Sequence, residues 1–268
     1  MRSDRITSCL SAVLVAAAAL GLAGCTGNNS VGPSGNSITE VRGFNALQGC
    51  PANVDIGQAN VAPTFTNLSY GAAPSGYTSV RAGVGLHYGV FTTGQSSPAL
   101  AAANVDLNPH DPTGNPSAGV YTLVGAGVCN PGSGMPAPRL VRLQDAFPSS
   151  FTGVNSGTVA LRVVNLVPDQ SGGITLASNG LAIHGSDDPG TNNVVYAGNG
   201  GTDTSRYNGG INPATNTALT IRNSSNAVIA TVPNFTFQPN HAYTLFVIGE
   251  VNPTPGGHAV SVVPVLDF

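Results

Sequence analysis

The pattern of hydrophobic and polar positions changes sharply along this chain. A nearly unbroken apolar run covers residues 9–24, after a short basic start that contains Arg2 and Arg5. Beyond it, apolar residues occur in short runs rich in β-branched and aromatic side chains, and Gly, Pro, Asn and Ser separate these runs. No later stretch keeps the 3.6-residue period of an amphipathic helix. The pattern therefore predicts short β-strands joined by turns.

The short apolar runs place the expected strands. They cover residues 41–47, 53–56, 86–93, 121–128, 139–145, 161–167, 173–176, 218–221, 228–232, 243–248 and 259–267. The four polar residues from Asn223 to Asn226 predict a turn between two of these strands.

The chain also repeats itself. Residues 41–47 (VRGFNAL) align with residues 161–167 (LRVVNLV), and residues 120–124 (VYTLV) align with residues 242–246 (AYTLF). Copies of about 110 residues are the size of a domain and longer than the units of a solenoid. We therefore predict two tandem antiparallel β-sandwiches, at residues 39–147 and 159–268, with an inter-domain linker at residues 148–158.

The amino-terminal apolar run has the proportions of a secretory signal peptide, which we place at residues 1–24. The run is shorter than the ~20 residues that span a bilayer comfortably. It ends in Leu22-Ala23-Gly24-Cys25, which resembles the lipobox of bacterial lipoproteins. The resemblance implies that a diacylglycerol is attached to the Cys25 thiol, and that the chain is cut before Cys25 and acylated there with a fatty acid such as palmitate. The alternative is an ordinary signal peptide with a chance cysteine.

The residue after the lipobox cysteine bears on localisation. In lipoproteins of Gram-negative bacteria an aspartate there retains the protein at the inner membrane, whereas this chain has Thr26. We therefore expect a lipid anchor in the outer membrane of the bacterial cell envelope. Residues 25–38 comprise the lipidated cysteine and a polar segment without apolar periodicity, which we interpret as a flexible linker.

Two cysteines remain once Cys9 leaves with the signal and Cys25 carries the lipid. In an oxidising compartment Cys50 and Cys129 are predicted to form a disulfide. On the chain-entropy model, closing so long a loop stabilises the first domain by roughly 4 kcal/mol. A catalytic thiol is the alternative, although no partner motif accompanies either cysteine.

Charge excludes one class of partner. Only 8% of the residues are charged, the net charge is -3, and lysine is absent. A nucleic-acid-binding protein needs a cluster of cations against the phosphates. We therefore expect no nucleic-acid partner.

Motifs for catalysis or for a metal are missing. The sequence contains no Gly-x-Ser-x-Gly, His-Glu-x-x-His or Cys-x-x-Cys, so we predict no catalytic residues, no metal and no cofactor. The five histidines are scattered: His87, His110, His184, His241 and His258. Two acidic loops, at residues 108–112 and 186–190, offer oxygen ligands for Ca²⁺. Asp-Pro is also a common start of a turn, so calcium binding by these loops stays open.

Glycine and aromatic residues raise two further possibilities. The glycine-rich segments 83–89 and 198–201 lack the Lys-Ser/Thr end of a phosphate loop, so we interpret them as hairpin turns. The chain has no tryptophan for a carbohydrate-binding platform. Four tyrosines are candidates for exposed stacking residues: Tyr70, Tyr77, Tyr88 and Tyr207.

Two segments of the second copy carry a family resemblance. Residues 161–169 (LRVVNLVPD) and 243–249 (YTLFVIG) resemble the bacterial domain of unknown function 4397, which often occurs in tandem in exported and lipid-anchored proteins. The match extends to the first copy, where Gln48-Gly49-Cys50-Pro51 replaces the Pro-Asp turn. The resemblance implies an immunoglobulin-like or transthyretin-like sandwich and brings no established catalytic residues.

Together these features predict a non-catalytic structural or interaction module of the cell envelope. We expect it to be held to the membrane through Cys25 and to contact an envelope protein or a glycan through its loops. The alternative is a secreted hydrolase or metal-dependent enzyme, whose active site would be assembled from the loops around His110, Asp111 and Asp187.

Overall fold

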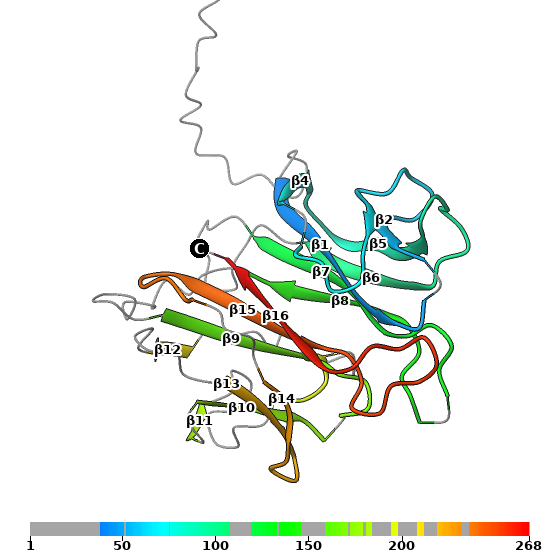
Figure 1. Cartoon of the computed structure of the whole chain (residues 1–268). Helices are drawn as coiled ribbons and strands as arrows, with labels where there is room; N and C mark the ends of the chain where they lie inside the picture. The colour runs from blue at the N-terminus through cyan, green and yellow to red at the C-terminus, as the bar shows by residue number, and fades with distance from the viewer. Residues whose placement is uncertain are drawn as a thin grey trace, which may run out of the picture. The chain divides into compact units, whose positions relative to one another are not determined.

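The computed structural model describes residues 38–50, 52–74, 76–107, 119–132, 134–145, 159–170, 172–178, 181–183, 194–197, 208–211, 219–231 and 236–267. These residues form strands and turns, and no α-helix occurs among them (Figure 1). Within these ranges, no helix is long and apolar enough to cross a membrane. The predicted signal peptide, most of the predicted linker 25–38 and the predicted linker 148–158 lie outside them.

The strands divide between the two sequence repeats. The first repeat contains β1 (Ile38–Gln48), β2 (Val54–Gln58), β3 (Phe65–Leu68), β4 (Thr78–Arg81), β5 (Gly83–Thr92), β6 (Ala101–Leu107), β7 (Val120–Val128) and β8 (Arg139–Gln144). The second contains β9 (Val159–Leu166), β10 (Ile174–Ser178), β11 (Leu181–Ile183), β12 (Asn208–Ile211), β13 (Leu219–Asn223), β14 (Val228–Thr231), β15 (Ala242–Ile248) and β16 (Ser261–Leu266).

Each repeat consists of two four-stranded sheets with the same strand order. The inner sheets, as we call them, have the orders β4-β1-β7-β8 and β12-β9-β15-β16, and the outer sheets have the orders β3-β2-β5-β6 and β11-β10-β13-β14. All paired strands are antiparallel except β1 with β7 and β9 with β15, which run parallel at equivalent places in the two inner sheets. The predicted all-β sandwich fold is confirmed.

Three apolar clusters hold the sheets together. One contains Val41, Ile56, Val90 and Leu123 and lies between the inner and outer sheets of the first repeat. Its counterpart in the second repeat contains Leu161, Leu176, Ile221 and Leu245. The third cluster joins the two inner sheets: it contains Phe44, Ala46, Val124, Ala126, Val141 and Leu143 from the first repeat with Val164, Leu166, Phe246, Ile248 and Val265 from the second.

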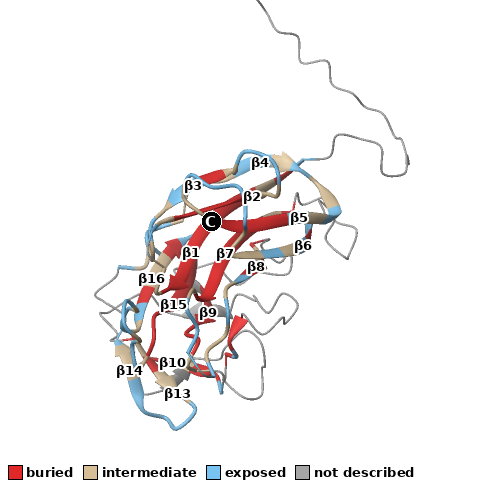
Figure 2. Ribbon diagram, turned by 90° about the vertical axis from the view of Figure 1, so that its right-hand side faces the viewer, coloured by how far each residue is buried: buried red, intermediate tan, exposed pale blue. Residues whose placement is uncertain are grey.

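The central strands of the inner sheets are buried on both faces. Every residue of β15 is buried, and in β7 only Val120 is partly exposed (Figure 2). Alternate side chains of β15 serve different clusters, because Leu245 packs within its own repeat while Phe246 packs against the other repeat. Strands covered on both faces read as continuous apolar runs, which explains the patterns VYTLVGAGV and AYTLFVI.

The repeats share a local device at the end of their first strand. The side-chain oxygen of Asn45 accepts a hydrogen bond from the backbone amide two residues ahead at 3.0 Å, and its nitrogen donates to the carbonyl of Leu68 at 2.9 Å. Asn165 makes the equivalent bonds, the second to the carbonyl of Val194 at 3.0 Å. One buried amide therefore joins two chain segments in each repeat through hydrogen bonds to backbone groups.

Most predicted strands are present with ends shifted by a few residues, and the Asn223–Asn226 turn is present with Asn226 at a φ of 63°. The interpretation of residues 83–89 as a hairpin turn is wrong, because they belong to β5. The glycines are accommodated by an irregularity in the pairing of β5 with β6 between Gly83 and Leu86. Residues 198–201 lie outside the described part of the chain.

Candidate functional site

Buried arginine and aspartate side chains from both repeats meet between the two inner sheets. Arg42 extends from β1 and forms an ion pair with Asp267, which follows the last strand of the other repeat. Arg162 extends from β9 and donates to Asp145, which follows the last strand of the first repeat, at 2.6 Å. The arginine of each repeat is thus paired with the terminal aspartate of the other repeat.

Each ion pair is held by a threonine on the strand beside it. The Nε atoms of Arg42 and Arg162 donate to the hydroxyls of Thr122 and Thr244, both at 2.8 Å. Each threonine hydroxyl in turn donates to the aspartate of its own repeat, Thr244 to Asp267 at 2.6 Å. These hydroxyls both accept and donate, so the network continues across the interface without a break.

The carboxylates are completely withdrawn from solvent. The side chains of Asp145 and Asp267 have an exposed fraction of 0%, and the side chain of Arg42 has 4%. Burial alone lowers the pKa of Arg42, but the negative charges of Asp145 and Asp267 outweigh it, so its pKa lies above the ordinary value. The guanidinium therefore stays charged, and charged carboxylates and cations balance one another within the interface.

Tyr77 closes the network on the side of the first repeat. Its ring lies under the guanidinium of Arg42, 4.7 Å from the cation to the ring centroid, and its hydroxyl donates to Asp145 at 3.0 Å. Burial and the nearby charge of Asp145 raise the pKa of Tyr77. The phenol therefore acts as a neutral hydrogen-bond donor and a cation-binding face.

Apolar packing continues the interface beyond the charges. The rings of Phe44 and Phe246 stack with centroids 4.5 Å apart and planes inclined by 29°. They face each other from β1 and β15, within the cluster that joins the inner sheets. Aromatic stacking and the surrounding aliphatic side chains provide the non-directional attraction, while the ion pairs fix the register of the two sheets.

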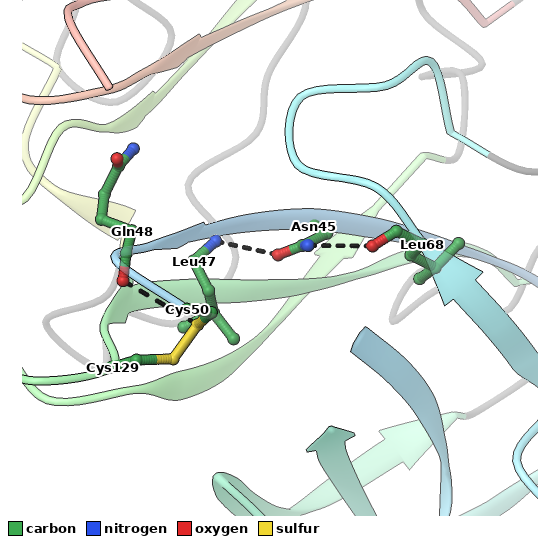
Figure 3. Close-up of a disulfide and its surroundings, with 6 residues drawn as sticks. All are labelled: Asn45, Leu47, Gln48, Cys50, Leu68 and Cys129. Carbon is green, nitrogen blue, oxygen red and sulfur yellow. Dashed lines mark hydrogen bonds between the residues drawn. A yellow bond between two sulfur atoms is a disulfide. The ribbon is translucent and has the colours of Figure 1, made fainter. Parts of the chain in front are cut away.

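The predicted disulfide between Cys50 and Cys129 is present, at the other end of β1 (Figure 3). The Cα atoms are 5.2 Å apart, within the usual range for a disulfide. Both cysteines pack against the apolar cluster of the first repeat. The neighbouring Gln48 is buried and contacts both Tyr70 and the backbone of His258 from the second repeat.

The structure separates the other predicted residues. Five of them lie outside the described residues: Cys25, His110, Asp111, His184 and Asp187. The structure therefore does not test the predictions of lipidation, of calcium binding and of a loop-borne active site. Among the residues that the structure describes, no group of three or more His, Cys, Asp or Glu side chains is placed to hold a metal ion. The side chains of the remaining described histidines lie apart from one another: His87 contacts Asn104, His241 contacts the carbonyl of Pro239, and His258 stacks on Tyr70.

The tyrosine candidates do not form an exposed platform. Tyr88, one of the four candidates for an exposed stacking residue, is only 3% exposed because it faces the core of the first repeat from β5. Tyr70 and Tyr77 are half-buried, and each is engaged at the interface between the repeats. Tyr207 lies outside the described residues.

An open cavity of about 630 Å³ lies beside the outer sheet of the first repeat. Its lining includes Asp55, Thr66 and Gln95. The buried carboxylate of Asp55 accepts hydrogen bonds from the backbone amides of Asn67 at 2.7 Å and Gly94 at 2.9 Å. Asp55 therefore joins β3 to the turn after β5 and contributes to the fold rather than offering a free carboxylate to the cavity.

Sequence reasoning missed the charged interface, although the sequence contains a signal for it. Arg42 aligns with Arg162 within the repeated segments, and Asp145 and Asp267 end the two closing strands. In a chain with 8% charged residues, a charge repeated at equivalent positions inside apolar strands is informative. Its partner was not predictable, because the alignment of two repeats does not show that each contacts the other.

Comparisons with known proteins add no family assignment. A scan of the chain against models of protein families gives no match, and a search of curated proteins finds no similar sequence.

Proposed function

We propose that this chain is a lipid-anchored, non-catalytic binding module of the bacterial cell envelope, composed of two immunoglobulin-like repeats of the domain of unknown function 4397. The lipobox that ends at Cys25 supports a lipid anchor, and Thr26 after it supports localisation to the outer membrane. The paired repeats hold their loops in a fixed relation, so that a partner, an envelope protein or a glycan, meets a preformed surface. Pre-organisation lowers the entropic cost of binding.

The reciprocal ion pairs carry this proposal. Five charged residues of the described structure are buried as whole residues, Arg42, Asp55, Asp145, Arg162 and Glu250, and the side chain of Asp267 is withdrawn from solvent as well. Each of them is engaged in hydrogen bonds or ion pairs within the chain that hold turns or join the repeats. Catalytic acids and bases instead direct their polar atoms toward a substrate site. The use of scarce charges to join two sandwiches favours a rigid binding body over an enzyme that opens between domains.

Mass spectrometry of the intact protein tests the anchor. The membrane-extracted protein is expected to begin at an acylated Cys25, and a Cys25→Ala variant is expected to lose both the acyl mass and the membrane association. An unmodified chain in the membrane-free fraction would contradict the envelope assignment.

Binding assays test the module itself. The purified full chain, with the acyl group removed by the Cys25→Ala substitution, is presented to immobilised envelope proteins and to cell-wall polysaccharides. Saturable binding that is lost in an interface variant such as Arg162→Ala, but kept in the surface variant Arg81→Ala, is expected for a rigid two-repeat binder. Hydrolysis of the polysaccharide that stops in His110→Ala and Asp111→Ala would favour the loop-borne enzyme instead.

A further inference from the structure

One end of the interface joins the disulfide of the first repeat to a loop of the second. Gln48 is the last residue of β1, and its backbone carbonyl accepts a hydrogen bond from the amide of Cys129 at 2.9 Å. Its side chain points away from the disulfide (Figure 3). The same residue therefore has its backbone tied to the cysteine pair and its side chain directed to the other repeat.

The side chain of Gln48 holds residues 250–258 of the loop between β15 and β16, which we call the strap. The Gln48 side-chain oxygen accepts a hydrogen bond from the backbone amide of His258 at 3.0 Å. Its nitrogen donates to the hydroxyl of Tyr70. The ring of Tyr70 stacks on the imidazole of His258 with centroids 4.1 Å apart and planes inclined by 10°. One buried amide thus attaches the strap directly and positions the ring on which it rests.

The strap is a preformed loop, so its attachment acts on it as a unit. The buried carboxylate of Glu250 accepts hydrogen bonds from the amide and hydroxyl of Thr254, at 2.7 and 3.3 Å. The amide of Glu250 donates to the carbonyl of His258 at 2.8 Å, which closes the loop at its base. Loosening the contact at His258 leaves these internal bonds intact and frees the loop from the first repeat.

The disulfide fixes the position of Gln48. Strands β1 and β7 run parallel and end together, with Gln48 opposite Val128. Strand ends fray unless they are tied down, and here the covalent tie joins Cys50, two residues after Gln48, to Cys129, one residue after Val128. Without the disulfide, the end of β1 and the side chain of Gln48 gain conformational entropy, and this entropy weakens the hydrogen bond between Gln48 and the strap.

We propose that the Cys50–Cys129 disulfide is a redox-controlled clasp for the strap. A dithiol reductant reduces the bond by thiol–disulfide exchange: the dithiol becomes a disulfide, and Cys50 and Cys129 each become a thiol, with two electrons and two protons transferred in total. The end of β1 then frays, Gln48 releases His258, and the exposed residues of the strap become free to rearrange. The second repeat has Pro168 at the position of Gln48 and contains no cysteine, so only this end of the interface is switched.

Hydrogen exchange of the full chain tests the clasp. Reduction with a dithiol is expected to speed exchange of the His258 amide by about tenfold or more, because that amide loses the Gln48 acceptor. The hairpin amides of Asn226 and Ala227, which bond only within their own turn, serve as the control and are expected not to change. Unchanged exchange at His258 together with faster exchange at Cys129 would overturn the proposal, since the strap would then be independent of the disulfide.

A variant separates the clasp from a general effect of the disulfide on stability. Gln48→Ala keeps the oxidised disulfide but removes the contact, so the His258 amide is expected to exchange as fast as in the reduced protein while β15 stays protected. Reduction is then expected to add no further change at His258. If the His258 amide exchanges as slowly in the oxidised variant as in the original chain, the proposal is wrong. This comparison uses oxidised protein only, so it decides the question even if reduction unfolds the first repeat.

Discussion

Arg162 and Asp145 form an ion pair at 2.6 Å across the two repeats, and both side chains have an exposed fraction of 0%. Among the residues that the structure describes, Arg162 is the largest of the fully buried side chains, and it donates hydrogen bonds to Thr244, to the carbonyl of Gln144 and to Asp145. Removing such charges from water costs several kcal/mol for each ion before their attraction offsets it. A pair of this kind chiefly selects how the inner sheets of the two repeats pack on each other, because any other packing leaves a buried charge unpaired.

Truncation of Arg162 is expected to be strongly destabilising. Arg162→Ala removes the closer of the two guanidinium groups that pair with the buried carboxylate of Asp145, which costs about 3–5 kcal/mol. Urea unfolding of the full chain measures the loss. Arg81→Ala, at an exposed position of β4, is the matched control and is expected to stay within about 0.5 kcal/mol of the original chain. Equal effects of the two substitutions would refute the special role of the buried arginine.

The reciprocal arrangement makes a further prediction about non-additivity. In Arg162→Met combined with Asp145→Leu, both charges are absent and neither is left unpaired, so the double variant is expected to be more stable than Arg162→Met alone. The free energies of unfolding of the two single variants and the double variant give the coupling energy. A double variant as unstable as the sum of the singles would show that the two residues act independently.

Two equivalent glycines are expected to resist substitution. Gly127 and Gly249 have φ values of 106° and 104°, and a Cβ at either position would collide with the backbone carbonyl of Ala137 or Ala259. Alanine there is expected to destabilise the chain by about 1–3 kcal/mol, because L-residues rarely adopt this backbone conformation. Gly132→Ala, at a position with open space around it, is the control for thermal unfolding. Tolerance of both Gly127→Ala and Gly249→Ala would contradict the structure here.

The sequence was sufficient for the fold class because strand patterns and turn residues are local. The duplication was also readable, since Arg42, Asn45 and Thr122 have counterparts in the second repeat. The disulfide followed from elimination among four cysteines. The pairing of Arg42 with Asp267 was not readable, because a repeat alignment gives equivalence and not contact. The parallel pairing of β1 with β7 was equally hidden, since the apolar run of a strand buried on both faces does not reveal the direction of its neighbour.

Two equivalent tyrosines, Tyr70 and Tyr196, differ in the hydrogen bonding of their hydroxyls, and the difference predicts opposite responses to the same substitution. Tyr70 and Tyr196 each lie two residues beyond the carbonyl that bonds the equivalent asparagine. Tyr70 receives a hydrogen bond from Gln48, but the position of Gln48 in the second repeat is Pro168, which has no side-chain donor. Among the described residues, the buried hydroxyl of Tyr196 has no hydrogen-bond partner.

Removal of the two hydroxyls tests this difference. Tyr70→Phe leaves the amide of Gln48 without its acceptor and is expected to destabilise the chain by ~1 kcal/mol. Tyr196→Phe removes a polar atom that is buried without a partner, so it is expected to be neutral or stabilising. Denaturant midpoints at pH 7 compare the two variants. A larger loss for Tyr196→Phe than for Tyr70→Phe would indicate a hydrogen-bond partner at Tyr196.

Alkaline pH is expected to destabilise the chain through the same tyrosines. Burial raises the pKa of Tyr196 to about 12, compared with about 10 for an unfolded tyrosine. The folded state therefore holds its phenolic proton where the unfolded state releases it. Its contribution to stability is complete below pH 10 and is lost as the pH rises through the range from 10 to 12. Tyr70 and Tyr77, whose pKa values burial also raises, act in the same direction.

Unfolding free energies measured between pH 8 and pH 11 test this pH dependence. They are expected to fall with increasing pH, and the slope is expected to be smaller in Tyr196→Phe, because this variant removes one group that titrates differently in the folded and unfolded states. Tyr243→Phe is a poor comparison, because the hydroxyl of Tyr243 accepts a hydrogen bond from the backbone amide of Gln238. Tyr88→Phe is the better comparison, because burial in the core of the first repeat also raises the pKa of Tyr88. A slope in Tyr196→Phe equal to that of the original chain would mean that the Tyr196 phenol ionises as readily in the folded protein as in the unfolded one, and that its side chain is accessible to water.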